Sequence, residues 1–378
     1  MGEQVFLSRC PGYELERLEE LVGELFCGLG VYEELKPGML AVVKPNLVIK
    51  AKPEEAVTTH PNLVAAVGRC LKKAGARVLI AESPGGPYTP AVMKSIFAAC
   101  GYPELAKREG FELYTACKSR EVSLPDGNRC RRMTVLEPFL DGDYIVNLAK
   151  LKTHCMLDMS GAVKNLFGAV PGLMKPELHC RFPEREAFAE MIVDLCELIR
   201  PQLSVIDAVE AMQGNGPTGG EKRFVGALVA SKSPYAADLA ASSLIGFSPM
   251  ELPLLRNAAD RGLCPQSLEE LDMRGGAPLE ALRVPDFKRA ESSSTDFLMR
   301  LPAFLRPFAK KVTTPAPKIR TKDCVGCGKC AESCPRHTIR IREKKAEIHY
   351  QKCIRCFCCH EMCPKRAIDI RRLGLFNL

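Results

Sequence analysis

The chain lacks the long apolar runs and leader features that tie proteins to membranes. None of its apolar runs reaches the roughly 18 residues that a membrane span needs. The first residues contain no basic stretch followed by an apolar one, and position 6 is Phe6 where a myristoylation signal has Ser or Thr. We therefore expect a cytoplasmic protein without a transmembrane segment.

Two motifs of common enzyme classes are also missing. The sequence has neither a P-loop ending in Gly-Lys-Ser/Thr nor a Gly-x-Ser-x-Gly elbow, which disfavours NTP hydrolysis and serine esterase chemistry. The basic residues near the C-terminus are not interleaved with stacking aromatics, so we expect no nucleic-acid partner.

Cysteine and positive charge are plentiful but concentrated in one place. The chain has 19 cysteines and a formal net charge of +8. Residues 318–378 hold nine of those cysteines, and 15 lysines and arginines against six acidic residues, so the remainder is close to neutral. Clustered cysteines in an intracellular chain indicate a metal or catalytic site rather than disulfides.

The C-terminal cysteines follow the spacing of bacterial ferredoxins twice. The run Cys-x2-Cys-x2-Cys-x3-Cys-Pro begins at Cys324 and again at Cys353, and the fourth cysteine of each run binds the other cluster. Paired zinc knuckles are the alternative, but their ligand spacing differs. The spacing therefore predicts two [4Fe–4S] clusters: cluster I held by Cys324, Cys327, Cys330 and Cys363, and cluster II held by Cys353, Cys356, Cys359 and Cys334.

Two further features of this segment bear on the clusters. Cys358 interrupts the second run, but only Cys359 keeps the three-residue gap to Cys363, so Cys358 is interpreted as a non-ligand. Each four-thiolate cluster carries a negative charge, which the surrounding lysines and arginines compensate. The same cations alternatively form a docking face for an acidic electron donor.

The first three-quarters of the chain alternates apolar strands with amphipathic helices. Near-continuous apolar runs occur at Met39–Lys44, Arg77–Ala81, Tyr144–Leu148, Leu203–Val209 and Val225–Ser231. Helical spacing occurs at Asn62–Ala74, Pro90–Ala99, Glu184–Arg200 and Pro234–Ile245. This alternation predicts an α/β fold over residues 1–285, with a largely parallel sheet and flanking helices. A linker at 286–317 and a small α+β ferredoxin-like unit at 318–378 would follow.

Polar and glycine-rich stretches follow four of these strands. Such sheets bind ligands at the carboxyl ends of their strands, so these stretches are expected to line one pocket. The small-residue loop Glu82–Gly86 suits backbone contacts to an anion. A structural role stays open for each residue: turns for the glycines, a hydrogen-bonded position for His154 and a lysine partner for Asp207.

The linker contains a short basic amphipathic stretch at residues 296–312. It either straps the ferredoxin unit to the α/β domain or lies on a membrane surface. Pro302 and Pro307 argue against a continuous helix, which favours the strap.

Several of these stretches resemble the family called domain of unknown function 362. The matching stretches are Val-Val-Lys44-Pro-Asn46-Leu, Leu-Lys152-Thr-His154, Met-Ser160-Gly161-Ala-Val-Lys164-Asn165-Leu-Phe-Gly168 and the stretch ending in Asp238. The resemblance extends from about Val5 to Ala367, and members commonly carry the same two-cluster module. It implies an iron–sulfur protein of anaerobic metabolism and names no substrate.

Together these features predict an iron–sulfur reductase. Low-potential electrons would pass from a donor protein, a ferredoxin or flavoprotein, through the clusters to an anionic small molecule or cofactor. Lys44, Lys152 and Lys164 would bind the anion, and Ser83, Gly85 and Gly86 would offer backbone donors to it. Asn46 and Asn165 would orient the ligand, and His154 with Asp207 would supply and position a proton. The expected catalytic group consists of Lys152, His154 and Asp207. The alternatives are a non-enzymatic electron carrier or maturation partner of another protein, and a redox sensor.

Overall fold

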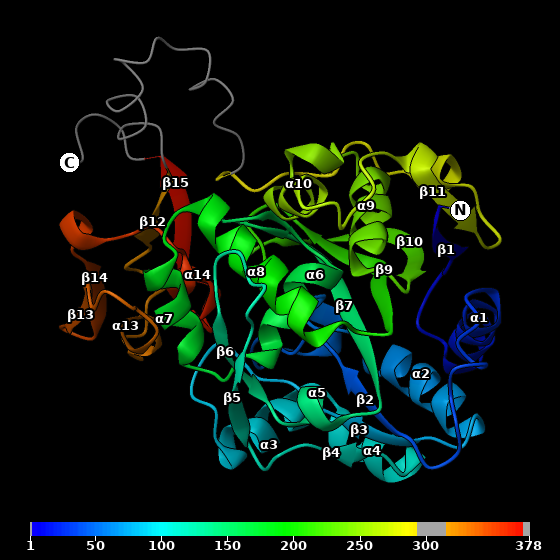
Figure 1. Ribbon diagram of the computed structural model, residues 1–378. Coiled ribbons are helices and arrows are strands. Elements are labelled where there is room, and N and C mark those ends of the chain that lie inside the picture. The colour runs from blue at the N-terminus through cyan, green and yellow to red at the C-terminus, as the bar shows by residue number, and fades with distance from the viewer. Residues whose placement is uncertain (1, 293–314, 373–378) are drawn as a thin grey trace.

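The computed structural model describes residues 2–292 and 315–372 (Figure 1). Both interpretations of residues 296–312, the strap and the membrane-surface stretch, concern residues outside this description. No helix in the described ranges is long and apolar enough to cross a membrane.

A mixed, mostly parallel sheet of nine strands forms the centre of the described α/β domain. Its order is β11-β1-β10-β9-β7-β2-β3-β4, and β8 pairs with β7 alone. Strands β9, β7, β2, β3 and β4 run parallel, whereas β10 lies antiparallel to both β9 and β1. The strands are β1 (Glu3–Arg9), β2 (Leu40–Lys44), β3 (Arg77–Ile80), β4 (Glu112–Leu113), β7 (Tyr144–His154), β8 (Asp158–Ser160), β9 (Leu203–Gln213), β10 (Glu221–Ser231) and β11 (Leu271–Arg274).

Helices cover both faces of the sheet and bury its alternating apolar side chains. Helices α1 (Leu15–Gly28), α2 (Pro61–Lys73), α3 (Pro90–Ala99) and α4 (Tyr102–Glu109) form one core with the sheet. Helices α6 (Ala162–Asn165), α8 (Arg185–Ile199), α9 (Pro234–Leu244) and α10 (Pro253–Asp260) form the other (Figure 1). Helices α5 (Pro138–Asp141) and α7 (Met174–Arg181) and the hairpin β5 (Ser119–Ser123) and β6 (Arg132–Leu136) complete the domain.

Strands β7 and β9 are longer than the sequence predicts. The apolar run of β7 ends at Leu148, but the strand continues to His154 with every residue buried. Lys150 in this extension lies opposite Asp207 of β9, and the two side chains form an ion pair of 3.0 Å. The lysine is accommodated inside the sheet because its charge is neutralised by the neighbouring strand.

The C-terminal unit contains two strand pairs and two short helices. Strand β12 (Pro315–Ile319) pairs with β15 (Ile368–Arg372), and β13 (Ile339–Arg342) pairs with β14 (Lys345–Ile348). Helices α13 (Lys329–Glu332) and α14 (Cys358–Glu361) carry cysteines. Since β12 begins at Pro315, the unit starts within the segment that the sequence assigns to the linker.

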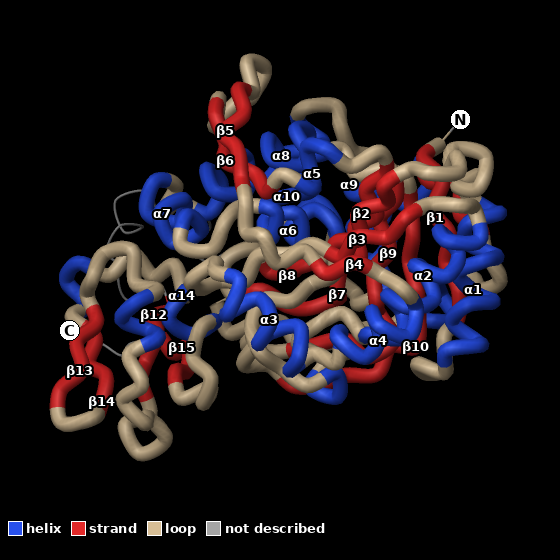
Figure 2. Tube along the Cα trace, turned by 90° about the horizontal axis from the view of Figure 1, so that it is seen from below, coloured by secondary structure: helices blue, strands red, loops and turns tan. Residues whose placement is uncertain are grey.

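The C-terminal unit lies against one end of the α/β domain (Figures 1 and 2). His360 Nε2 lies 3.0 Å from the Asn215 carbonyl oxygen, and Thr218 Oγ1 donates to the Glu361 carbonyl at 3.1 Å. Arg366, one of the cations near the clusters, forms an ion pair with Glu55. These contacts place α14 over the carboxyl end of the parallel strands.

Candidate functional site

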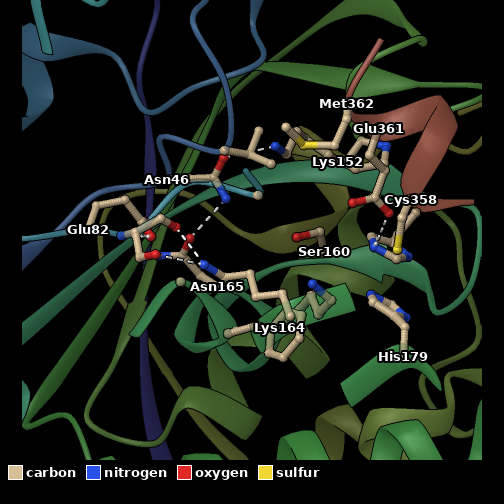
Figure 3. A pocket seen from close by; sticks show the side chains of 18 of the residues that line it. Asn46, Glu82, Lys152, Ser160, Lys164, Asn165, His179, Cys358, Glu361 and Met362 are labelled. Atoms are coloured by element: carbon tan, nitrogen blue, oxygen red, sulfur yellow. Dashed lines mark hydrogen bonds and ion pairs between the residues drawn. The ribbon is translucent and has the colours of Figure 1, made fainter. Parts of the chain in front are cut away.

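A cavity of about 70 Å³ lies between the strand ends of the α/β domain and helix α14 (Figure 3). The loops after β2 and β3, the ends of β7 and β8, and helices α6 and α7 supply one wall. The C-terminal unit supplies Cys358, Glu361 and Met362. Of the predicted ligand residues, the cavity gathers Asn46, Ser83, Gly85, Lys152, His154, Lys164 and Asn165.

Lys152 is held by a chain of buried amides. Its ammonium donates to Asn46 Oδ1 at 2.9 Å and to the Val57 carbonyl at 2.8 Å. Asn46 donates in turn to Asn165 Oδ1 at 2.9 Å, and Asn165 donates to Asn147 Oδ1 at 2.8 Å. Asn46 and Asn165 therefore hold Lys152 in place, and both line the cavity.

Two lysines of the site have pKa values close to neutrality. Lys175 donates to Ser83 Oγ and to the Ser83 and Pro84 carbonyls at 2.8–3.0 Å, all uncharged acceptors. Burial lowers the pKa of Lys175 and of Lys152 to about 7, and for Lys152 the charge of Lys164 acts in the same direction. Both ammonium groups therefore exchange protons near pH 7.

Lys164 is the cavity cation without an ion pair or hydrogen bond within residues 2–292 and 315–372. Its ammonium lies 4.7 Å from the centre of the Phe167 ring. It projects from α6, whose first turn is fixed by the Asp238 carboxylate, which accepts from Ala162 N at 2.5 Å and Val163 N at 3.1 Å. Gly161 is required at the start of this turn because a Cβ there would collide with Asp238.

His154 has its tautomer set by the backbone. Its Nδ1 accepts hydrogen bonds from Met156 N at 3.1 Å and Leu157 N at 3.2 Å, so the ring proton is on Nε2. Burial lowers the pKa of His154, and the nearby Glu361 carboxylate acts in the opposite direction. His154 is thus a hydrogen-bond donor through Nε2.

Glu361 of α14 faces His154 across the cavity (Figure 3). Its Oε1 lies 3.3 Å from His154 Nε2, although the two groups are not aligned as a hydrogen bond. Burial raises the pKa of Glu361, but His154 and the nearby Lys164 outweigh this effect and hold the pKa at about 2. The C-terminal unit therefore contributes a carboxylate to a pocket otherwise rich in cations.

The structure places three predicted residues outside the cavity. Lys44 is fully buried and forms an ion pair of 2.6 Å with Glu82, which neutralises it. Gly86 does not line the cavity. Asp207 lies within the sheet, where it binds Lys150 and accepts from Tyr13 Oη at 2.8 Å, so it does not position His154.

The backbone donors expected in the Glu82–Gly86 loop are already engaged. Ser83 N donates to the Gly168 carbonyl at 3.0 Å and to Glu82 Oε1 at 2.7 Å. Gly85 N donates to the Val48 carbonyl at 3.1 Å. These two N–H groups therefore hold the loop in place and do not serve an anion.

A further loop has the glycine spacing of a dinucleotide motif in a different setting. Residues 214–219 read Gly-Asn-Gly-Pro-Thr-Gly, which matches Gly-x-Gly-x-x-Gly. The loop joins the antiparallel strands β9 and β10 instead of opening a helix after a parallel strand. It therefore lacks the helix N-terminus on which a pyrophosphate rests, and it serves as a contact for α14.

The cysteines of the C-terminal unit surround two small cavities. One is lined by Cys324, Cys327, Cys330 and Cys363, and the other by Cys334, Cys353, Cys356 and Cys359. Backbone N–H groups also point at three of the sulfur atoms, at 3.4 Å for Cys324 and Cys334 and 3.2 Å for Cys363. Four thiols with N–H donors are the donor set that a [4Fe–4S] cluster takes, so both cavities fit one.

Cys358 connects the second of these cavities with the ligand cavity. Its side chain is buried and lines both. The sequence identifies Cys358 only as an extra cysteine; the structure places it between the predicted cluster II and the cations of the α/β domain.

Comparison with protein families identifies both parts of the chain. Residues 41–243, more than half of the chain, match the model of a domain of unknown function, DUF362. The chain belongs to the DUF362 family. Residues 316–364 match a 4Fe–4S dicluster domain, so this DUF362 protein carries an iron–sulfur electron-transfer domain.

One curated relative and two solved structures are similar to this DUF362 protein. A thylakoid-associated protein of Synechocystis sp. is 32% identical over 274 residues, which cover 71% of the chain and 83% of the relative. The lactate racemase apoprotein of Thermoanaerobacterium thermosaccharolyticum is 15% identical, with a TM-score of 0.41, over 64% of this chain and 57% of that one. A protein of Thermotoga maritima is 12% identical, with a TM-score of 0.33, over 51% and 50% of the two chains.

Sequence reasoning missed several residues of the DUF362 site. Ser160 and Gly168 lie in the family stretch, whereas Lys175 and His179 follow it on α7. Glu361 and Met362 lie far along the chain from the cavity residues of the α/β domain, which run from Asn46 to Pro217. The sequence feature that could have indicated Glu361 and Met362 is their position between the cluster cysteines Cys359 and Cys363, close to Cys358, which has no assigned role.

Proposed function

We propose that this protein is an iron–sulfur reductase that passes low-potential electrons through two [4Fe–4S] clusters to a small anionic molecule in the α/β cavity. The observation that carries the proposal is the position of Cys358, which lines both the cluster II cavity and the ligand cavity. Bound clusters supply one-electron transfer at low potential. One side chain then separates the electron source from the ligand.

The residues of the cavity have roles that suit reduction of an anion. Lys164 attracts the anion, and His154 donates a hydrogen bond to it through Nε2. Lys152 supplies the proton, because its pKa of about 7 lies near the working pH of a general acid. Among the described residues, two of its three N–H groups have acceptors, so one N–H group remains for the ligand.

Electrons are proposed to enter at cluster I from an acidic donor protein such as a ferredoxin or flavoprotein. Cys327 is exposed, and the neighbouring Val325 is 56% exposed, whereas the cluster II cysteines are covered to a greater degree. Exposed lysines beside cluster I, Lys322 and Lys329, suit an acidic surface.

Single-turnover oxidation of the reduced protein tests this function. Anaerobic, dithionite-reduced protein is mixed with small reducible acids, including 2-oxo acids, hydrogencarbonate and sulfite, and cluster absorbance is followed. One acid should oxidise the clusters faster than buffer does, and Lys152→Met should slow this step by about 10²–10⁴. Oxidation by a second redox protein alone, with every acid inert, would establish the carrier function instead.

A further inference from the structure

Four polar groups face the ligand cavity without a hydrogen-bond partner in the described parts of the chain. Three are buried atoms: His154 Nε2, His179 Nδ1 and Glu361 Oε1, of which the first and last lie 3.3 Å apart without the alignment of a hydrogen bond. The fourth is the ammonium of Lys164, which contacts the Phe167 ring. Unpaired buried polar groups cost free energy, and most native side chains avoid it. Their gathering in one cavity indicates that a ligand completes their hydrogen bonds.

Three of these groups each have a fixed role as hydrogen-bond donor or acceptor. His154 is a donor, because its Nδ1 already accepts two backbone N–H groups. Lys164 has only donors. Glu361, when ionised, has only acceptors. A ligand that satisfies all three must present an oxygen acceptor to Lys164 and His154 and an O–H or N–H donor to the carboxylate.

The cavity also limits the size of the ligand. An apolar cavity of about 150 Å³ holds benzene, and this one measures about 70 Å³. The enclosed part of the ligand therefore has about three to five non-hydrogen atoms. Dinucleotides and sugar phosphates are too large to be enclosed here.

We propose that the cavity binds a small monoanion with one ionised oxygen and one protic group, as in a short hydroxycarboxylate. The ionised oxygen contacts Lys164 and His154 Nε2, and the O–H or N–H donates to Glu361. The proposal rests on the proposed function, since it names the class of ligand that the same site binds. It is nevertheless tested by binding, without turnover.

Three ligands that differ by one feature test the proposal by calorimetry on the anaerobic, cluster-loaded chain. Glycolate has both features, acetate lacks the hydroxyl and glycolamide lacks the charge. Glycolate should bind about tenfold more tightly than acetate, and glycolamide should not bind measurably. Equal affinity for glycolate and acetate, or no binding of glycolate, would overturn the proposal, even if the clusters are oxidised by another acid as the proposed function requires.

Variants separate the named contacts from general effects on folding. Glu361→Gln should weaken the glycolate preference, because an amide oxygen accepts less strongly than a carboxylate. It should bind acetate more tightly, because the variant removes a repulsive charge; a purely structural role would weaken both. Lys164→Met should weaken both acids at least tenfold, whereas Lys94→Met, at an exposed position of α3, should leave them unchanged. An unchanged glycolate affinity in Lys164→Met would contradict the assigned contact.

Discussion

At the scale of single residues, the cavity is unusual because two of its lysines are held by uncharged protein oxygens rather than by carboxylates. Lys152 and Lys175 both rest on amide or hydroxyl oxygens, and burial brings both pKa values to about 7. Such groups are largely neutral at pH 8 when no anion is bound. A bound anion favours their charged form and raises their pKa values.

Anion binding should therefore take up protons at pH 8. Calorimetry of glycolate binding in two buffers of different ionisation enthalpy measures this uptake directly. The affinity should fall as pH rises from 7 to 9, because charging the lysines becomes more costly. Lys152→Met should lower the uptake. A binding heat that does not depend on the buffer would contradict the assignment.

The buried Lys44–Glu82 pair gives a prediction about stability. Lys44→Met leaves the Glu82 carboxylate buried without its partner, which should cost about 3–5 kcal/mol of unfolding free energy. The double variant with Glu82→Gln should recover most of this loss, as measured by urea denaturation. The exposed pair of Arg77 and Glu112 is the control, and Arg77→Met should leave the midpoint unchanged. Equal losses in the single and double variants would be inconsistent with a charge effect.

At the scale of elements, apolar periodicity locates the strands but not their ends. The central strands of the sheet and helices α2, α3, α8 and α9 follow from the sequence because their apolar patterns are continuous. The extension of β7 to His154 does not, since Lys150 and Lys152 interrupt the pattern. Their partners, Asp207 on β9 and Asn46 after β2, come from distant parts of the chain. Such pairing between distant residues cannot be predicted from the local sequence.

Helix α14 packs against the loop after β9, and this packing requires that Gly219 has no side chain. A Cβ there would lie 2.6 Å from the His360 ring, which is held by the Asn215 and Ile368 carbonyls. Gly219→Ala should lower the unfolding free energy by about 1–3 kcal/mol and increase proteolysis at the junction. Gly23→Ala in α1, with open space around it, should instead stabilise by about 0.5–1 kcal/mol. Similar behaviour of both variants would argue against this contact.

At the scale of the whole molecule, the site is assembled from two units. The sequence predicts the strand-end lysines and the cluster cysteines separately, because each follows a local motif. It does not predict that Cys358 and Glu361 face His154, since that contact depends on how the units pack. The same packing explains why Asp207, a reasonable partner for His154 from the sequence, is replaced by Glu361.

Crossed ligation makes the C-terminal unit a single cooperative site. Cys334→Ala and Cys353→Ala belong to different cysteine runs but should remove the same cluster, leaving about four of about eight iron atoms and one EPR signal. Cys324→Ala and Cys363→Ala should remove the other. Cys358→Ala should retain all the iron. Loss of different signals in Cys334→Ala and Cys353→Ala would exclude the crossed arrangement.

The central claim is that the ligand cavity lies next to cluster II. Electron–nuclear double resonance on the reduced protein with ¹³C-labelled glycolate tests it, because a nearby nucleus couples to the unpaired electron of the cluster. The account predicts a ¹³C coupling on the EPR signal that Cys353→Ala removes, and none on the signal that Cys324→Ala removes. Glycolate that binds by calorimetry but couples to neither cluster, or only to cluster I, would contradict it.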